Sequence, residues 1–403
     1  MNGEDIFKSI VSGEDQSILG NVARAGLLLL SKGYKKAVTM RNAKFDANKG
    51  VVKVSVPVIS VGNITAGGTG KTPMVRLICD ILGQKGFHPT VLSRGYRAKD
   101  NSQNTIISKH GSILVEPEES GDEAWLLAKV LSKSSVIIGR NRIESARIAI
   151  EELGADYLVM DDGFQHRALH RDKDIVLIDA SNPFGYEHVL PRGLLREPME
   201  GLARADIIVL TKVDQVDPGL VAALRKRLAR MVPQKPVYET IHKPRAVYTL
   251  DAWANGDEGH PIGTDSDLPI MAVSGIGNPK SFTKTLEGCG YDVVHTMGFG
   301  DHHDFSDDDV VEIWKQAFAH QAKAIMITEK DAVKLSQLHT IEDLKIPILV
   351  LSIGIEFISG KQEFIGLLYY FVGAVCAVGA TVLAMMAFAM SRVTGRSKYI
   401  TWV

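Results

Sequence analysis

The sequence has few cysteines and no excess of charge of either sign. Its three cysteines, Cys79, Cys289 and Cys376, lie far apart and form no metal-binding spacing. They are typical of buried thiols in a reducing compartment. The formal net charge is −1, so nothing in the overall charge favours binding to nucleic acid. Residues 1–16 are polar and partly acidic, and we expect no cleavable signal peptide there.

The length and composition favour a globular α/β protein of two domains. The chain has 403 residues, of which 45% are hydrophobic and 23% are charged. We expect an N-terminal region at 1–50, a phosphate-loop domain at 51–236, a smaller α/β domain at 237–360 and a hydrophobic tail at 361–403; the resemblance described below makes the N-terminal region a membrane-associating one.

The strongest motif is a glycine-rich turn between a strand and a helix. Residues 56–61 are apolar and β-branched, which predicts a buried strand, and Lys71 opens a run with helical character. Backbone N–H groups of such a turn, together with the positive end of the helix, bind phosphate. We expect Lys71 to reach the β- and γ-phosphates and Thr72 to ligate Mg²⁺. The expected nucleotide-binding residues are Thr65, Ala66, Gly67, Gly68, Thr69, Gly70, Lys71 and Thr72.

This turn departs from the usual phosphate-loop pattern at one position, because Thr65 stands where the first glycine is expected. The alternative is a glycine-rich connection that binds no ligand. The Lys-Thr pair follows the glycines in register, and it favours a nucleotide site.

Two adjacent carboxylates end a second apolar strand. Asp161 and Asp162 follow Tyr157-Leu-Val-Met, which is the pattern of a strand that holds Mg²⁺ beside a phosphate loop. The two side chains would point to opposite sides of a continuing strand, so we expect them to have different roles.

Other candidate residues are ambiguous when taken alone. Arg94 ends a strand, where open α/β sheets bind ligands, and Arg196 lies in a loop where its guanidinium could hold phosphate. Taken alone, an arginine such as Arg196 is more typical of a surface residue. Asp122 is in the first turn of a predicted helix, where a carboxylate favours the helix dipole. His302 lies in an acidic loop, as a solvated turn residue or as a proton shuttle.

A GTPase-like motif keeps another nucleotide-binding class open. Thr211-Lys-Val-Asp214 is similar to the Asn-Lys-x-Asp loop that reads guanine in GTPases, with threonine in place of asparagine. The alternative function is therefore a GTPase or ATPase switch at a membrane.

The chain changes character near residue 235. Pro233, Pro236 and Pro244 precede a stretch through Asp267 that we expect to be irregular and to separate the domains. A second α/β unit is predicted after it.

Two segments are suited to membranes. Residues 17–49 combine an apolar helix with a basic stretch, which is typical either of an interfacial helix or of a core helix with a solvated tail. Residues 364–390 contain no charged residue and are long enough to cross a bilayer. The basic residues beyond 390 would place the C-terminus in the cytoplasm, where the nucleotide site must also be. Either the large globular part of the chain sets the orientation in spite of the basic residues of the short tail, or the segment lies in the membrane without crossing it.

Taken together, these motifs resemble the tetraacyldisaccharide 4′-kinases, also called lipid A 4′-kinases. The resemblance covers about residues 15–360. The matching stretches are Val61-Gly-Asn-Ile-Thr-Ala-Gly-Gly-Thr-Gly-Lys-Thr-Pro73, Leu92-Ser-Arg-Gly-Tyr-Arg97, Gly121-Asp-Glu123, Asp161-Asp-Gly-Phe-Gln-His166, Leu195-Arg-Glu-Pro198, Asp301-His302 and Thr328-Glu-Lys-Asp-Ala-Val333.

The resemblance implies an activity and a place in the cell. The activity is transfer of the γ-phosphate of ATP to the 4′-hydroxyl of a lipid-linked glucosamine disaccharide 1-phosphate, which gives lipid IVA in lipid A synthesis. The place is the cytoplasmic face of the inner membrane, reached through the N-terminal helix. The partners are the lipid A precursor and membrane lipids, with no nucleic acid and no obligate protein partner evident. The fold implied is a phosphate-loop domain and a smaller α/β domain joined by a two-stranded linker.

The resemblance also implies roles for individual residues. Lys71 and Thr72 match phosphate and Mg²⁺ ligands, and the acidic Mg²⁺ cluster corresponds to Asp161, Asp162 and Gln165. Asp122 matches the proposed general base, oriented by His302. The residues that match positions near the phosphates or the sugar are Arg94, Arg196 and Glu197. The hydrophobic tail has no counterpart in this family, so its role stays open.

Overall fold

The computed structural model describes residues 3–100, 102–262, 268–338, 340–341 and 345–369. The chain separates into two compact units, Met1–Ser359 and Gly360–Val403. In the second unit, residues 361–369 are helical. Most of the span predicted at 364–390 therefore lies outside the described residues. Within the described part of the chain, no helix has both the length and the apolar character needed to cross a membrane.

The first unit is built on one large, mostly parallel sheet. Its described strands follow the order β11-β10-β12-β13-β9-β8-β7-β1-β6-β2-β5-β3-β4. Only the pairs β9–β13, β3–β4 and β3–β5 are antiparallel. The predicted α/β class with a mostly parallel sheet is confirmed.

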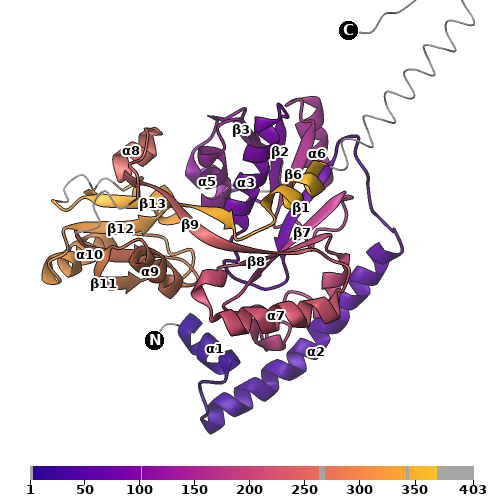
Figure 1. Cartoon of the computed structure of the whole chain (residues 1–403), viewed down its shortest axis with the longest axis horizontal. Coiled ribbons are helices and arrows are strands. Elements are labelled where there is room, and N and C mark those ends of the chain that lie inside the picture. The colour runs from indigo at the N-terminus through magenta and orange to yellow at the C-terminus, as the bar shows by residue number, and fades with distance from the viewer. Residues whose placement is uncertain (1–2, 101, 263–267, 339, 342–344, 370–403) are drawn as a thin grey trace, which may run out of the picture. The chain divides into compact units, whose positions relative to one another are not determined.

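The strands fall into a larger lobe, a smaller lobe and a connection between them (Figure 1). The larger lobe contains β1 Val58–Asn63, β2 Pro89–Ser93, β3 Thr105–Lys109, β4 Ser112–Ile113, β5 Ser135–Ile138, β6 Tyr157–Asp161, β7 Lys173–Asp179 and β8 Ile207–Thr211. The smaller lobe contains β10 Pro269–Ser274, β11 Asp292–Gly298 and β12 Ala324–Thr328. The long strands β9 Val237–Thr249 and β13 Ile348–Phe357 run between the lobes.

Helices cover the sheet and one side of the larger lobe. The larger lobe carries α3 Lys71–Gln84, α4 Pro117–Ser120, α5 Asp122–Val130, α6 Arg142–Glu151, α7 Pro218–Met231 and the 3₁₀ turns η1 Gly185–Glu187, η2 Met199–Arg204 and η3 Val213–Gln215. The smaller lobe carries α8 Leu250–Asn255, α9 Pro279–Gly288, α10 Asp307–Ala319 and α11 Glu329–Leu335. The N-terminal helices are α1 Gly3–Ser12 and α2 Ile18–Asp46.

The predicted strand, glycine turn and helix occur as β1 and α3. Every residue of β1 is buried, and α3 buries Met74, Ile78 and Leu82 on one face. Apolar residues at positions i, i+4 and i+8 lie on one side of a helix, so α3 packs closely on the sheet. This packing fixes the turn between the two elements.

The stretch between the domains is more regular than expected. We predicted an irregular segment from the prolines through Asp267, but residues 237–249 form β9 and pair with β13. Pro244 lies opposite Ile353, where the register shifts. Proline cannot donate a hydrogen bond to the ladder, and the irregularity accommodates it without ending the strand. The prediction was wrong because it treated proline as a break.

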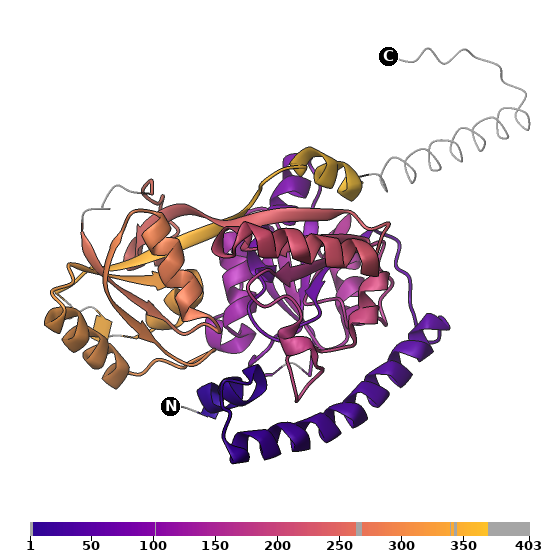
Figure 2. The ribbon, with the colours of Figure 1, turned by 60° about the horizontal axis from the view of Figure 1, so that its bottom comes forward.

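Helix α2 exposes its apolar side chains. Ile18, Leu19, Leu29 and Leu30 are 86%, 81%, 68% and 63% exposed, and only Gly20, Ser31 and Val38 are buried. Figures 1 and 2 both show α2 running below α7 at the side of the larger lobe. The alternative of a core helix is therefore wrong.

Gly62 lies where β1 meets the loop that follows β6. A Cβ atom there would lie 2.6 Å from Phe164 Cβ and 2.7 Å from its backbone nitrogen. We predict that Gly62→Ala destabilises the fold by about 1–3 kcal/mol, as other overpacked core substitutions do. Gly26→Ala is the control, because Gly26 is in α2 with nothing within 4 Å, and helix propensity predicts a gain of up to about 1 kcal/mol. Urea denaturation measures both; equal stability of the two variants would contradict the packing argument.

Candidate functional site

The glycine turn has the backbone conformation of a phosphate cradle. Gly67 and Gly70 have φ angles of 116° and 87°, a region that side chains with a Cβ rarely occupy. Helix α3 begins directly afterwards at Lys71. The Asn63 side-chain amide donates to Thr69 Oγ1 at 2.9 Å and holds the turn from inside. Phosphate would therefore meet backbone N–H groups and the positive end of α3.

The threonine at the first position of the turn has a structural explanation. Thr65 forms an antiparallel bridge with Leu195, and the Ala66 N–H donates to the Leu194 carbonyl. A β-branched residue suits this extended pairing, whereas glycine would weaken it. The same pairing continues with the Arg196 N–H donating to the Ile64 carbonyl at 2.7 Å. The loop that carries Arg196 is thus fixed beside the phosphate loop.

Asp161 and Asp162 have different partners, as expected. Asp162 lies between two cations: its carboxylate is 2.7 and 2.8 Å from the Arg196 guanidinium and 3.6 Å from Lys71 Nζ. Burial alone would raise its pKa, but Lys71 and Arg196 outweigh it and hold the pKa at about 2. Asp162 is a carboxylate at any physiological pH.

Asp161 is almost fully buried and has fewer partners. Ser93 Oγ donates to its Oδ2 at 3.2 Å, and its Oδ1 has no hydrogen-bond partner among the described residues. Burial, and then the nearby charges of Asp162 and Glu123, raise its pKa to about 6. A buried carboxylate oxygen without a partner is costly unless a ligand binds it.

The other predicted substrate and metal residues differ in their exposure to solvent and in their hydrogen-bond partners. Arg94 is exposed at the end of β2. Glu197 is fully buried, and its carboxylate accepts from Arg204, Gln165 and Asn42. Glu197 therefore holds α2 and Gln165 in place. Gln165 keeps its Oε1 without a partner among the described residues, while its Nε2 is occupied.

The expected Asp122–His302 contact is not formed in this conformation. Asp122 begins α5, and its Oδ2 is 3.1 Å from Lys334 Nζ. His302 Nε2 is 3.2 Å from Lys330 Nζ and 3.8 Å from Glu123 Oε1. Burial and the Lys330 ammonium lower the His302 pKa, which favours neutral imidazole. The two residues lie in one charged network but are not bonded to each other.

Sequence reasoning missed the lysines of this network. Lys330 and Lys334 lie on α11 of the smaller lobe, and they contact Glu123 and Asp122 on α5 of the larger lobe. Lys334 also donates to the backbone carbonyls of His302 and His303. Their spacing of four residues places them on one helix face, but only the fold shows which acids they meet.

Backbone strain marks the same region. Arg97, Asp162 and His302 have φ angles of 61°, 50° and 61°. Residues other than glycine adopt this left-handed conformation at a cost, and such residues concentrate at functional sites. Arg97 also bonds the His302 carbonyl across the lobes, whereas Asp162 is held separately by Arg196 and Lys71.

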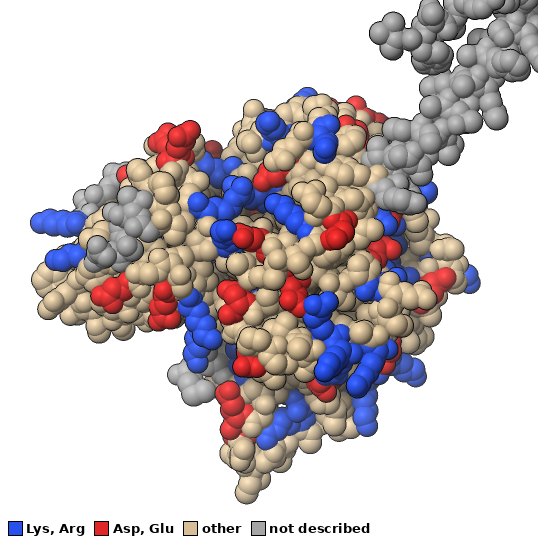
Figure 3. Space-filling view, in the orientation of Figure 1, with Lys and Arg blue, Asp and Glu red and all other residues tan. Residues whose placement is uncertain are grey.

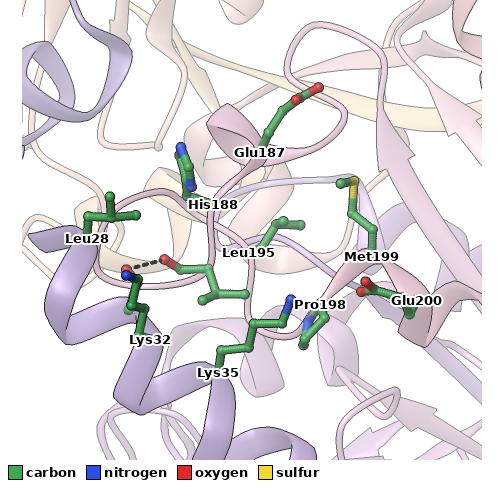
Figure 4. Close-up of a pocket in the computed structure, with 11 residues that line it drawn as sticks. Leu28, Lys32, Lys35, Glu187, His188, Leu195, Pro198, Met199 and Glu200 are labelled. Carbon is green, nitrogen blue, oxygen red and sulfur yellow. Dashed lines mark hydrogen bonds between the residues drawn. The ribbon is translucent and has the colours of Figure 1, made fainter.

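A pocket lies beside the Arg196 loop, between α2 and the residues after η1 (Figure 4). Ser31 Oγ donates to the Val189 carbonyl at 2.9 Å across it. The side chains of Lys32 and Lys35 supply ammonium groups, and Leu28 and Leu195 supply apolar surface. Glu187 and Glu200 also line the pocket, so it combines charged groups of both signs with apolar surface.

Comparison with known proteins identifies the family. A model of the family described as tetraacyldisaccharide-1-P 4′-kinase matches residues 23–370. The chain belongs to this family. The match includes the glycine turn, the paired acids, the charged network and both lobes.

Individual members of the tetraacyldisaccharide-1-P 4′-kinase family are similar over most of their length. A tetraacyldisaccharide 4′-kinase of Syntrophus aciditrophicus (strain SB) is 40% identical over 334 residues, which are 81% of this chain and 87% of the relative. One of Anaeromyxobacter sp. (strain K) is 40% identical over 320 residues, or 79% and 82% of the two chains. A crystal structure of LpxK from Aquifex aeolicus in complex with ATP aligns with a TM-score of 0.68 at 30% identity, covering 86% of this chain and 99% of that chain.

The raised pKa of Asp161 gives a testable stability effect. A folded-state pKa of about 6, above the ordinary 3.8, means that ionising Asp161 destabilises the fold as pH rises through this range. We predict that Asp161→Asn is more stable than wild type by on the order of 3 kcal/mol at pH 8, and that the difference disappears below about pH 4. Urea denaturation at several pH values, in buffer free of divalent cations, measures it. A variant less stable than wild type at pH 8 would contradict the assignment.

Proposed function

We propose that this chain transfers the γ-phosphate of ATP to the 4′-hydroxyl of a tetraacylated glucosamine disaccharide 1-phosphate, giving lipid IVA. The observation that carries the proposal is the arrangement around Asp162. Lys71 of the nucleotide loop and Arg196 of the adjoining loop converge on one carboxylate beside the phosphate cradle. Family membership supplies the acceptor: the relatives are named for this kinase activity.

The chemistry follows from the charges at this point. Phosphoryl transfer depends mainly on holding the reactants in line and on neutralising charge on the phosphate oxygens. Lys71 and Arg196 both contact Asp162, and each could leave this carboxylate to contact a bound phosphate instead. Asp162 therefore keeps both cations aligned until the nucleotide is present.

We further propose that Mg²⁺ is held by Asp161 and Thr72, with Asp162 and Gln165 beside it. The buried Asp161 Oδ1 and the Gln165 Oε1 both lack a partner among the described residues, and oxygen ligands of this kind suit Mg²⁺. The described residues contain no cluster of three or more His, Cys, Asp or Glu side chains able to hold a metal by themselves. Mg²⁺ commonly takes one or two carboxylates together with phosphate oxygens, so the donor set fits. When bound, the ion would supply positive charge that neutralises the phosphate oxygens.

Asp122 is the proposed base for the acceptor hydroxyl, with His302 as its orienting partner. In the present conformation Lys334 holds Asp122, and Lys330 contacts both His302 and Glu123. A small movement of the smaller lobe would separate Lys334 from Asp122 and Lys330 from His302, and would bring the imidazole to the Asp122 carboxylate. Until that movement, the two lysines would prevent Asp122 from acting as the base.

The lipid acceptor is proposed to reach the site along α2. The exposed apolar residues of α2 can enter the headgroup region of a bilayer, and its lysines can contact anionic lipid. Figure 3 shows lysine and arginine side chains gathered at the lower right, over α2 and α7. The pocket with Lys32 and Lys35 lies between this helix and the Arg196 loop. These features support docking at the cytoplasmic face of the inner membrane.

The activity prediction concerns Lys71. Removing one preorganised cation from a transferring phosphoryl group costs about 10²- to 10³-fold in rate. We predict this loss for Lys71→Ala in transfer of radiolabelled phosphate from ATP to the disaccharide 1-phosphate lipid in detergent. Lys85→Ala, at the other end of α3, is the control and should stay within about twofold of wild type. No transfer by wild type would overturn the proposed function.

The membrane prediction concerns the exposed face of α2. An environment-sensitive fluorophore on Val22→Cys, in a chain with Cys289 and Cys376 replaced by serine, should shift to the blue when anionic vesicles are added. Leu220→Cys on α7 is the matched control, since Val22 and Leu220 are both 64% exposed. This comparison does not depend on whether the C-terminal tail also binds the bilayer. An unchanged spectrum at position 22 would rule out insertion of α2.

A further inference from the structure

Helix α5, which carries the proposed base Asp122, contacts both lobes. It lies against α3, β3 and β5 of the larger lobe. In addition, its Leu126 belongs to the hydrophobic core of the smaller lobe, in one cluster with Leu250 of α8 and Val333 of α11. Figure 1 shows α5 on the side of the larger lobe that is next to α8. The position of Asp122 therefore depends on how the smaller lobe holds α5.

The far end of α5 is held by a lysine between two tryptophans. Lys129 Nζ lies 5.7 Å from the centroid of the Trp125 ring and 5.8 Å from that of the Trp253 ring on α8. It also donates a hydrogen bond to the backbone carbonyl of Ala254, near the C-terminal end of α8. Aromatic faces and the last carbonyls of a helix both attract ammonium groups. Trp125, Lys129 and Trp253 thus form a clamp that joins α5 to α8.

The clamp and the proposed base lie on one face of α5. Asp122, Trp125, Leu126 and Lys129 are spaced by three and four residues, which places them on one side of the helix. Asp122 contacts Lys334 of α11 at the start of α5, and Lys129 lies seven residues later, about 10 Å along the helix axis. The two ends of this face therefore meet two different helices of the smaller lobe. A change at the clamp would tilt α5 and displace Asp122.

A lysine is a costly residue for this contact. Trp253 is only 4% exposed, and burial lowers the pKa of Lys129 because its ammonium group loses part of its hydration. An apolar side chain would fill the same space without this cost. However, two ring faces and one carbonyl fix the place of the ammonium group, which apolar packing alone does not. The lysine therefore contributes position more than stability.

We propose that Lys129 is a positioning residue for phosphoryl transfer, which fixes α5 against α8 and thereby fixes Asp122 relative to the nucleotide and to His302. The proposal rests on the proposed function, since that function makes Asp122 the base. Lys129 acts through Asp122, because it lies at the other end of the helix. The clamp keeps this end of α5 on the smaller lobe while the contacts of Asp122 exchange.

The test is steady-state transfer of phosphate from ATP to the disaccharide 1-phosphate lipid in detergent, with the full chain. We expect Lys129→Met to lower kcat about ten- to hundredfold, because a small displacement of a reacting group costs that much in rate. The KM for ATP should stay within about twofold of wild type, because the variant leaves the phosphate loop unchanged. Lys129→Arg keeps a cation over the rings and should restore kcat to within about threefold of wild type.

Lys133→Met is the matched control. Lys133 is exposed just beyond the end of α5, so this variant should keep the wild-type kcat. Urea denaturation of each variant shows whether it is folded under the assay conditions. An unchanged kcat in Lys129→Met, or an equal loss in Lys129→Met and Lys129→Arg, would overturn the proposal.

A second pair of variants separates positioning from a general effect on the fold. If Lys129 acts through Asp122, adding Lys129→Met to Asp122→Asn should lower the remaining rate by less than about twofold, because the two changes remove the same contribution. The full loss in both backgrounds would show that Lys129 does not act through Asp122, and it would overturn the proposal.

The clamp can also be tested without lipid. In a chain with Trp314 and Trp402 replaced by phenylalanine, only Trp125 and Trp253 remain as tryptophans. Acrylamide should quench their fluorescence more strongly in Lys129→Met than in wild type or Lys129→Arg, and equal quenching in all three would overturn the clamp. A wild type that transfers no phosphate refutes the proposed function, whereas a wild type that does so with unchanged kcat in Lys129→Met refutes only the role of Lys129.

Discussion

The Asp162 carboxylate is the point on which the arrangement of the site depends. Lys71 approaches it from the start of α3, and Arg196 approaches it from a loop that pairs with the first residues of the glycine turn. Two cations beside the phosphate cradle would repel each other if no anion lay between them. Asp162 supplies that anion, at the cost of a left-handed backbone. The neighbouring Asp161 carries no such pair, which leaves its raised pKa and its free oxygen for a metal ion.

A second charged network joins the larger and smaller lobes. Lysines of α11 hold the acids that begin α5, and Arg97 holds the backbone of the loop that carries His302. The Arg97 side chain is exposed, so its contact contributes little to stability and can break readily. The lysine–acid pairs are mostly buried, with side-chain exposures of 17% and 39% for Lys330 and Glu123 and of 12% and 18% for Lys334 and Asp122, so separating them without new partners would be costly. The buried sheet with its linker strands β9 and β13 keeps the lobes together meanwhile.

Local features of the site could be predicted from the sequence, whereas distant pairings could not. The strand β1, the start of α3 and the paired acids depend on residues close in the chain, and all three occur as expected. Glu197 was expected near the phosphates or the sugar, and that role stays a prediction. Its partners Arg204, Gln165 and Asn42 could not be predicted, because no local pattern links them to it. The residue pattern alone missed strand β9, although the family resemblance implied a two-stranded linker, because only its pairing with β13 makes an extended, proline-containing segment stable. The contact of Asp122 with Lys334 joins the two lobes, so it can be predicted only when the fold is known.

The central claim is that phosphate leaves ATP for a lipid-borne hydroxyl at the edge where Lys71, Arg196 and the two acids meet. The most direct measurement is ³¹P NMR of the reaction of the wild-type chain with ATP, Mg²⁺ and the tetraacylated disaccharide 1-phosphate. The account predicts one new phosphomonoester on the 4′ position of the lipid for each ADP formed, and none when Mg²⁺ is chelated. ADP and inorganic phosphate with unchanged lipid would contradict it.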